Sequence, residues 1–381
     1  MKLPYAKVAL VKVKILRLVR PNLSHAKVDT SLNFNMATFL LMCEETERSL
    51  RKQRVFRDRT MQLETLTDLD LISRYRLTRE AIFCLVDKVR PLVERPTQRS
   101  YAMTVESQVL FTLRYLGKGG FLSEIGDLHG LDKSSVSRGF HSTVNAICTV
   151  LDNITFPWSH EQQTKVQQAF YRIGHFPKVL GAVDGTLIPI KRPSPNDEAA
   201  YICRKGYHAI NVQAICDSSL RFTNVVAKWP GSTHDSLIWS SSQVGMRMEE
   251  TAPDGWLLGD SGYACRPWML TPLADPQTKP EQKFNAAHIR TRNTVERAFG
   301  VLKSRFRCLH KSTGCLWFNP QRCVAVIMAT FKLHNFCIDN KVAPPLEEAV
   351  VDHVDEENNP EVRQCQDGCA TRSKLITERF T

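Results

Sequence analysis

Four acidic residues stand where their side chains could do chemistry: Asp184, Asp235, Asp260 and Glu296. Asp184 interrupts the apolar stretch 179–190, whose Val, Ile and Leu residues predict a strand buried on both faces of a sheet. An ionised carboxylate is costly in such a strand, and a bound cation would make its charge tolerable. Taken alone, Asp184 could equally be a hydrogen-bonded core aspartate that caps a turn.

Together the four acids predict metal-assisted hydrolysis of a phosphodiester. An in-line displacement needs the attacking water deprotonated and the leaving oxygen neutralised, and two metal ions about 3.5 to 4 Å apart do both. Mg²⁺ and Mn²⁺ take hard oxygen ligands, so carboxylates without dedicated Cys or His ligands suit them. Without metal the clustered acids would repel one another, and one or more would stay protonated. Gly185 would let a ligand or a second backbone approach Asp184 closely.

The charge balance points to the same substrate class. The 381 residues include 51 Lys and Arg against 39 Asp and Glu, a net charge of +12, which favours nucleic acid or an anionic membrane surface as partner. No apolar run reaches the roughly 18 residues that would span a bilayer. We therefore expect DNA as the partner, and no membrane.

The cysteines favour reduced thiols over a metal module. All 12 are scattered, without the paired spacing of a zinc site. The alternative is a structural zinc site, because some His and Cys residues between positions 310 and 337 approach the spacing of zinc ligands: His310, Cys315, Cys323, His334 and Cys337.

The N-terminal part should consist of a basic arm and a helical domain. Residues 1–53 predict a mobile basic arm, with a mitochondrial presequence as the alternative interpretation. Residues 54–155 predict helices that begin at caps such as Thr78 and Thr104. Within them a short helix, a glycine turn and a longer helix from Asp132 have the form of a helix-turn-helix.

The second helix of that pair would present a polar end to DNA. Its exposed N-terminal residues suit phosphate contacts and base edges: Lys133, Ser134, Ser135, Ser137 and Arg138. Lys303 and Arg307, which follow Glu296, could track a DNA backbone. Solvated faces of ordinary helices are the alternative in both places.

The elements that must bring the four acids together lie in residues 175–340. The pattern predicts a meander of three strands, a helix from His234, a short strand that ends at Asp260 and a late helix that carries Glu296. This order describes an α/β, ribonuclease H-like mixed sheet in which the first strand and the end of the fourth lie side by side. Residues 341–381 predict an acidic, mobile C-terminal tail.

The motifs around the acids resemble those of the Harbinger transposase-derived nucleases, which belong to the DDE transposases. The likeness covers about residues 55 to 340. Thirty-five residues lie between Asp260 and Glu296, a separation described for many DDE enzymes. The matching stretches are Ala182–Thr186, Arg204–Gly206, Pro230–Ser236, Leu258–Tyr263, Leu270–Pro272, Phe284–Asn285, Asn293–Gly300 and Leu302–Phe306.

This resemblance implies a catalytic triad of Asp184, Asp260 and Glu296 that holds divalent metal, with Asp235 as a fourth metal-binding carboxylate. It implies a DNA endonuclease that uses Mg²⁺ or Mn²⁺, a separate Myb-like DNA-binding partner, and residence in nucleus and cytoplasm with nuclear entry dependent on that partner. A homo-oligomer is compatible with it. All four acids are present, which favours an active enzyme. A catalytically silent DNA-binding or recruitment protein is the alternative.

Overall fold

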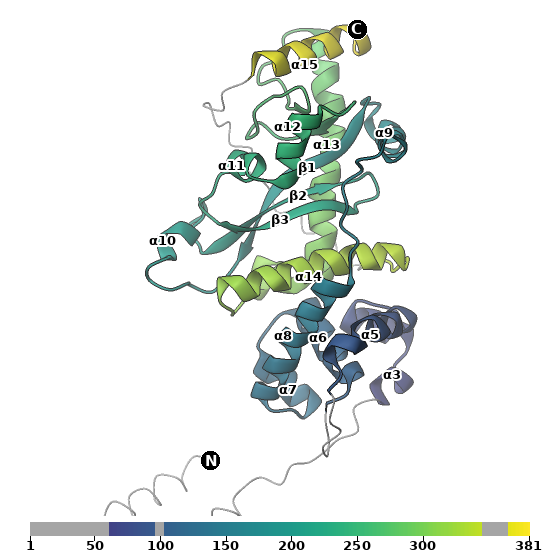
Figure 1. Cartoon of the computed structure of the whole chain (residues 1–381), viewed down its shortest axis with the longest axis vertical. Coiled ribbons are helices and arrows are strands. Elements are labelled where there is room, and N and C mark those ends of the chain that lie inside the picture. The colour runs from purple at the N-terminus through teal and green to yellow at the C-terminus, as the bar shows by residue number, and fades with distance from the viewer. Residues whose placement is uncertain (1–60, 96–102, 345–364) are drawn as a thin grey trace, which may run out of the picture. The chain divides into compact units, whose positions relative to one another are not determined.

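The computed structural model describes residues 61–95, 103–344 and 365–381. The predicted basic arm, residues 1–53, lies outside the described residues. Within them the chain forms a mixed α/β structure with one five-stranded sheet (Figure 1). No helix in the described ranges is long and apolar enough to cross a membrane.

The sheet has the strand order β3-β2-β1-β4-β5. Antiparallel pairing joins β1 to β2 and β2 to β3, whereas β4 runs parallel to β1 and β5 parallel to β4. The expected neighbourhood of the first and fourth strands is therefore confirmed. The strands are β1 (Val179–Pro189), β2 (Ala209–Cys216), β3 (Phe222–Pro230), β4 (Trp256–Leu258) and β5 (Met269–Leu270).

Helices cover both faces of the sheet, which is why β2 is buried at every position. On one face α13 (Lys279–Arg305) and α14 (Pro320–Asp339) pack against strand residues such as Ala182. On the other face α11 (Asp235–Ser240) and α12 (Gln243–Thr251) lie over residues such as Val183. Successive side chains of β1 therefore face different helices.

The edge strand β3 is tied to α14 by one side chain. Asn335 accepts from the backbone N–H of Phe222 at 2.9 Å and donates to its carbonyl at 2.8 Å. His334, next along α14, contacts the carbonyl of Leu220 through Nε2 at 2.8 Å. These bonds satisfy backbone groups that an edge strand leaves unpaired.

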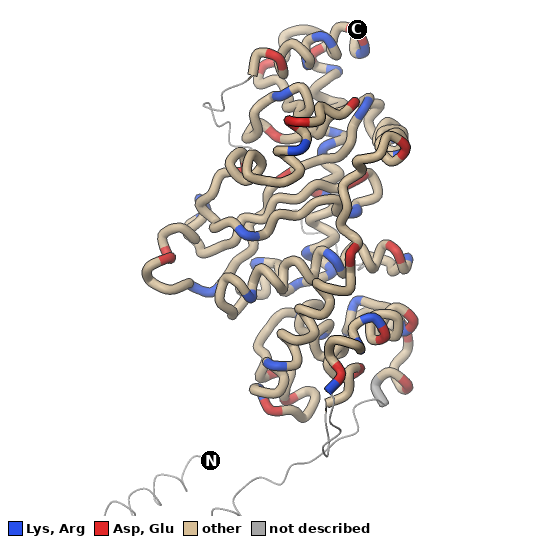
Figure 2. The backbone as a smooth tube through the Cα atoms, viewed as in Figure 1, with Lys and Arg blue, Asp and Glu red and all other residues tan. Residues whose placement is uncertain are grey.

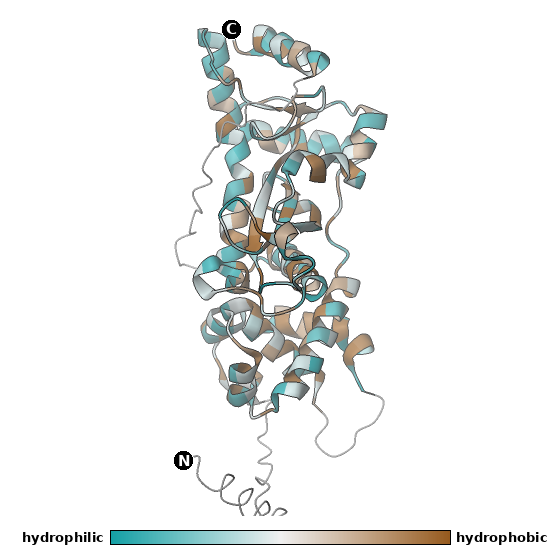
Figure 3. Ribbon diagram, turned by 90° about the vertical axis from the view of Figure 1, so that its left-hand side faces the viewer, coloured by the Kyte–Doolittle hydropathy of each residue, from teal (hydrophilic) through white to brown (hydrophobic). Residues whose placement is uncertain are grey.

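The N-terminal helices share a hydrophobic core with the sheet. A single cluster includes buried residues of the helices between residues 68 and 150, of α13 and α14, and of the central strands. Figure 3 shows hydrophilic and hydrophobic segments side by side along these helices, as expected where one face of each is buried. The helices are α3 (Met61–Thr65), α4 (Asp68–Tyr75), α5 (Arg79–Val93), α6 (Val105–Lys118), α7 (Leu122–His129) and α8 (Lys133–Val150).

Two helix boundaries differ from the sequence prediction. The apolar residues Ile82, Leu85, Val86 and Val89 predict a helix that ends at Pro91, but α5 continues through this proline to Val93. The apolar stripe that includes Val295 and Phe299 predicts a helix over residues 292–307, but α13 begins at Lys279. Pro280 lies in its first turn, where a missing N–H costs no hydrogen bond, and Thr278 caps it reciprocally with Glu281.

The prediction of a mobile tail from residue 341 is wrong for its last part. Residues 366–379 form α15 (Gln366–Arg379), which packs on α13 and β5. Leu375, Ile376 and Phe380 are buried in a cluster with residues of β4, β5 and α9 (His160–Gly174). Arg372 donates to the carbonyls of Thr271 and Pro272 just beyond β5. The prediction rested on the acidic residues before this helix and did not consider the apolar residues that α15 buries.

Candidate active site

Asp184 is a buried carboxylate in the middle of the sheet, on the face that α13 covers. Its residue is 3% exposed. Oδ1 accepts from the backbone N–H of Gly185 at 2.7 Å, and Oδ2 accepts from Nη1 of Arg292 at 3.2 Å. Burial raises the pKa of Asp184 to about 7, against the attraction of Arg292, and the charges of Asp260 and Asp235 add to the rise.

Asp260 lies beside Asp184 because of the parallel pairing of their strands. Leu258, the last residue of β4, pairs with Ala182 of β1, so that residues two positions further along meet at the same level of the sheet. The backbone N–H of Gly262 donates to Oδ1 of Asp260 at 3.0 Å and holds the turn that follows the strand. Side chains beyond the carboxyl ends of parallel strands meet in this way at sites of many α/β proteins.

Glu296 joins the site from α13 through an arginine one turn earlier. Nη2 of Arg292 donates to Oε1 of Glu296 at 2.6 Å, while its Nη1 reaches Asp184. The side chain of Arg292 is 7% exposed and that of Glu296 is 27% exposed. The register of α13 against the sheet is fixed partly by His288, whose Nε2 contacts the carbonyl of Leu270 in β5 at 3.0 Å.

Asp235 occupies the opposite face of β1. A Cβ added to Gly185 would lie 2.6 Å from Oδ1 of Asp235, so this carboxylate sits where the side chain of residue 185 would point. Because neighbouring side chains in a strand point to opposite faces, Asp184 points the other way. We expected all four acids in one cluster. The structure instead places Asp235 across the strand from Asp184, within range of its charge.

Asn211 and Gln213 of β2 position Asp235, and sequence reasoning assigned no role to either. Nδ2 of Asn211 donates to Oδ1 of Asp235 at 2.8 Å. Nε2 of Gln213 donates to the carbonyl of Asp235 at 3.0 Å and to the hydroxyl of Tyr263 at 2.8 Å. Burial raises the pKa of Asp235, against the bond from Asn211. The sequence signal that could have identified them is a pair of amide side chains two residues apart, and so on one face, in an otherwise apolar strand.

The acids of this site offer only oxygen ligands, which suit a hard divalent cation, but in this structure their side chains are not placed to share one. In the described residues no three His, Cys, Asp or Glu side chains are placed so that they could hold a metal ion together. Arg292 lies between Asp184 and Glu296 and contacts both. Burial and the charges of Asp260 and Asp235 raise the pKa of Asp184, although Arg292 and the N–H of Gly185 act to lower it. Oxygen-only ligands with unbalanced negative charge are those that Mg²⁺ and Mn²⁺ prefer.

The metal-free protein should lose stability through Asp184 as pH rises from about 4 to about 7. The pKa of Asp184 is higher in the folded state, about 7, than its ordinary value of 3.8, so the folded state binds more protons in this window. Stability then falls as that proton leaves. The free energy of unfolding of Asp184→Asn, minus that of the wild type, should rise across the window and level off above it. Urea unfolding in EDTA measures this difference, and a constant difference would contradict the account.

The predicted DNA-contacting residues fall into two groups. On α8, Lys133, Ser134 and Arg138 are exposed, and Ser135 and Ser137 are partly exposed. Near Glu296, Arg307 is partly exposed, but Lys303 is only 7% exposed. The expectation that Lys303 tracks a DNA backbone is therefore wrong, because its side chain packs inside the protein. Figure 2 shows Lys and Arg spread over the helices and the sheet region alike.

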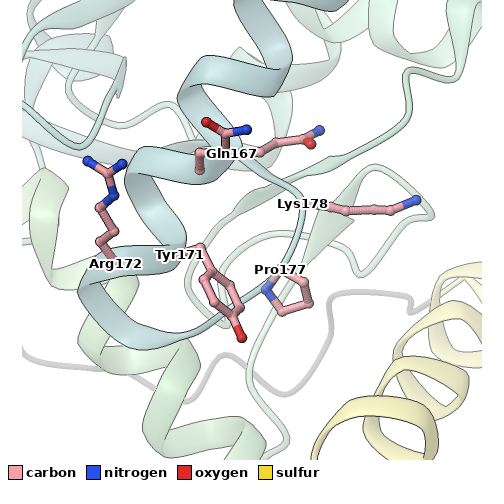
Figure 4. A pocket seen from close by; sticks show the side chains of 6 residues that line it. Gln167, Tyr171, Arg172, Pro177 and Lys178 are labelled. Carbon is pink, nitrogen blue, oxygen red and sulfur yellow. The ribbon is translucent and has the colours of Figure 1, made fainter.

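Two of the candidate zinc ligands are engaged in other contacts: Nε2 of His334 contacts the carbonyl of Leu220 at 2.8 Å, and Nδ1 of His310 contacts the hydroxyl of Ser312 at 2.7 Å. A shallow pocket on α9 and the start of β1 is lined by residues that include Tyr171, Arg172 and Lys178 (Figure 4). None of the four acids lines it.

Comparison with protein families matches residues 183–335 to the DDE superfamily endonucleases. This range begins at Val183 within β1 and ends at Asn335 on α14, so it contains β2 to β5 and all four acids. No solved structure matches the chain at a significant level.

Curated relatives extend the likeness beyond this range. The chain is 35% identical to the Mus musculus protein named Putative nuclease HARBI1 over 280 residues, which cover 73% of this chain and 80% of that protein. The Homo sapiens protein of the same name gives the same identity and coverage. A more distant relative, Protein ALP1-like of Arabidopsis thaliana, is 28% identical over 62% of this chain and 61% of its own length.

Proposed function

Because the chain belongs to the Harbinger transposase-derived nucleases of the DDE endonuclease superfamily, we propose that it is a DNA endonuclease that cleaves phosphodiester bonds with divalent metal. One observation carries the proposal: Asp184 lies in β1, Asp260 follows the end of the parallel neighbouring strand β4 by two residues, and Arg292 bridges Asp184 to Glu296. The strand order and the helix α13 over the sheet support a ribonuclease H-like catalytic domain.

In the proposed reaction Asp184, Asp260 and Glu296 would hold Mg²⁺ or Mn²⁺. Two such ions, when bound, would supply activation of the attacking water and neutralisation of the leaving oxygen. Asp184 supplies a carboxylate whose position is fixed by the strand and by the N–H of Gly185. Burial of this carboxylate keeps bulk water from screening its charge, so its contribution is larger than at a surface. Asp235 holds the N-terminus of α11 against β1 and adds negative potential from the opposite face of the strand. We expected it to be a fourth metal ligand, but propose this positioning role in its place.

Conversion of supercoiled plasmid tests the proposal directly. The purified full chain with Mg²⁺ should produce nicked circles that carry 3′-hydroxyl ends, and EDTA should stop the reaction. Absence of nicking with both Mg²⁺ and Mn²⁺, on plasmid and on linear duplexes, would overturn it.

We propose that α7, the turn at Gly130 and α8 act as a helix-turn-helix that contacts DNA. Gly130 adopts a left-handed conformation, φ 60°, that ends α7 and lets α8 begin at Lys133. Each lost phosphate contact lowers the salt dependence of binding by about 0.9 in the log–log slope. The variant Lys133→Gln/Arg138→Gln should therefore bind duplex DNA more weakly, with a slope about 2 smaller. Fluorescence anisotropy against salt measures this, and an unchanged slope would exclude contact by these residues.

A second candidate function is that of a DNA-bound recruitment protein that does not cleave. The observation that favours it is the ion pair of Arg292 with both Asp184 and Glu296, which occupies the carboxylates without metal. One Arabidopsis thaliana relative, 25% identical, is named Antagonist of Like Heterochromatin Protein 1. Binding of DNA without nicking in either metal would favour this function.

We propose that a Myb-like DNA-binding protein is the partner, that nuclear entry from the cytoplasm depends on it, and that the chain assembles with itself on DNA. These proposals rest on the family. If the tagged chain enters the nucleus equally with and without such a partner, the dependence is excluded.

A further inference from the structure

Among the described residues, Arg292 is the basic residue that forms an ion pair with Asp184. Its guanidinium joins Oδ2 of Asp184 at 3.2 Å to Oε1 of Glu296 at 2.6 Å. These two acids come from different elements, β1 and α13. The arginine therefore stands where the oxygens that a shared ion would need face one another.

The position is built into the helix. Arg292 and Glu296 are four residues apart on α13, so their side chains lie on the same face one turn from each other. That face packs on β1, which buries the guanidinium until 7% of the side chain is exposed. A buried guanidinium is held by its hydrogen bonds to the charged acceptors and is costly to leave without them.

From this geometry we propose that Arg292 is a tethered competitor of the divalent metal: it bridges Asp184 and Glu296 in the metal-free protein and must release at least Glu296 before the carboxylates can share an ion. The inference rests on the proposed metal-dependent function. It assigns Arg292 a positioning role that sets metal affinity, which neither the motif match nor the charge count suggests.

The competition follows from what each group can accept. A carboxylate oxygen that accepts from the guanidinium lies next to a positive charge, which repels a divalent cation approaching the same oxygen. Glu296 is the side chain that can move, because it is 27% exposed, whereas Asp184 is fixed by the strand. Removal of the guanidinium thus frees two ligands without altering the oxygen donors themselves.

Metal binding, measured without any reaction, tests the inference. Calorimetric titration of the full chain with Mn²⁺ alone, at one fixed pH for all variants, measures the affinity. A hydrogen bond to a charged group corresponds to about tenfold or more in affinity. Because Arg292→Gln lacks the guanidinium that competes for the carboxylates, it should bind Mn²⁺ about tenfold more tightly than wild type. Arg292→Lys, which keeps the positive charge, should stay within a few-fold of wild type. Arg290→Gln, on an exposed position of the same helix, is the matched control.

The outcomes separate this inference from the proposed function. Equal Mn²⁺ affinity in wild type and Arg292→Gln, or weaker binding in the variant, overturns the competitor role and leaves the nuclease proposal standing. Absence of Mn²⁺ binding by either protein overturns both. If Arg292→Gln fails to fold, ¹⁵N-arginine NMR of the wild type replaces it: the signal that is missing from Arg292→Lys should shift on addition of Mg²⁺, and an unchanged signal overturns the role.

Discussion

Asp184→Ala, Asp260→Asn and Glu296→Gln are each expected to slow plasmid nicking by on the order of 10³-fold. A metal ion supplies several kcal/mol of stabilisation to the charge that develops in the transition state, and each 1.36 kcal/mol is about tenfold in rate. Each variant removes a ligand from that ion. The measured quantity is the initial rate of nicked-circle formation in Mg²⁺.

The matched control for these variants is Glu161→Gln, which removes an acid from a side chain that is 79% exposed on α9 and pairs only locally with Lys165. It should nick DNA at the wild-type rate. Equal nicking by the three site variants would show that the cleavage comes from a contaminant. Circular dichroism must confirm that each variant is folded, because Asp184 and Arg292 form a buried pair.

Deletion of residues 345–381 is expected to lower the free energy of unfolding by about 3 kcal/mol or more, because it exposes the apolar surface that α15 covers. Phe380 packs its ring 5.6 Å from that of Phe176 and 5.5 Å from that of Phe284, both fully buried. The deletion also removes Arg372 from the carbonyls of Thr271 and Pro272. The midpoint of urea unfolding measures the loss.

The single substitution Phe380→Ala should reproduce much of this effect, about 3 kcal/mol for a buried aromatic side chain. Lys374→Ala/Glu378→Ala, on the exposed face of α15, is the control and should change stability by less than about 0.5 kcal/mol. If the deletion leaves the unfolding midpoint unchanged, residues 365–381 contribute nothing to the fold.

Four of the five strands could be predicted from the sequence because they are apolar runs with clear ends, whereas β5, only two residues long, was not predicted. The neighbourhood of β1 and β4 follows from their order and from the helices between them. Helix α9 was not predicted, because its polar residues give a weaker periodic signal. The start of α13 was missed because a proline-rich stretch precedes residue 292, whereas Pro280 stands in the first turn of the helix, where its missing N–H costs no hydrogen bond.

The candidate site was harder to predict than the strands, because its details depend on which side of β1 each acid occupies. Asp235 was grouped with the other acids on sequence alone, and only the position of Gly185 in the strand shows that it lies behind Asp184. Arg292 gave no signal of its own, since an Arg four residues before a Glu is an ordinary helix pair. Lys303 was expected at the surface because charge alone does not reveal burial.

A structure of the full chain soaked in Mn²⁺ tests the central claim most directly. The account predicts an anomalous peak at coordination distance from the carboxylates of both Asp184 and Asp260, with Glu296 turned toward it and released from Arg292. A site that stays without Mn²⁺, or Mn²⁺ bound only elsewhere on the protein, would contradict the claim that these acids share a divalent metal.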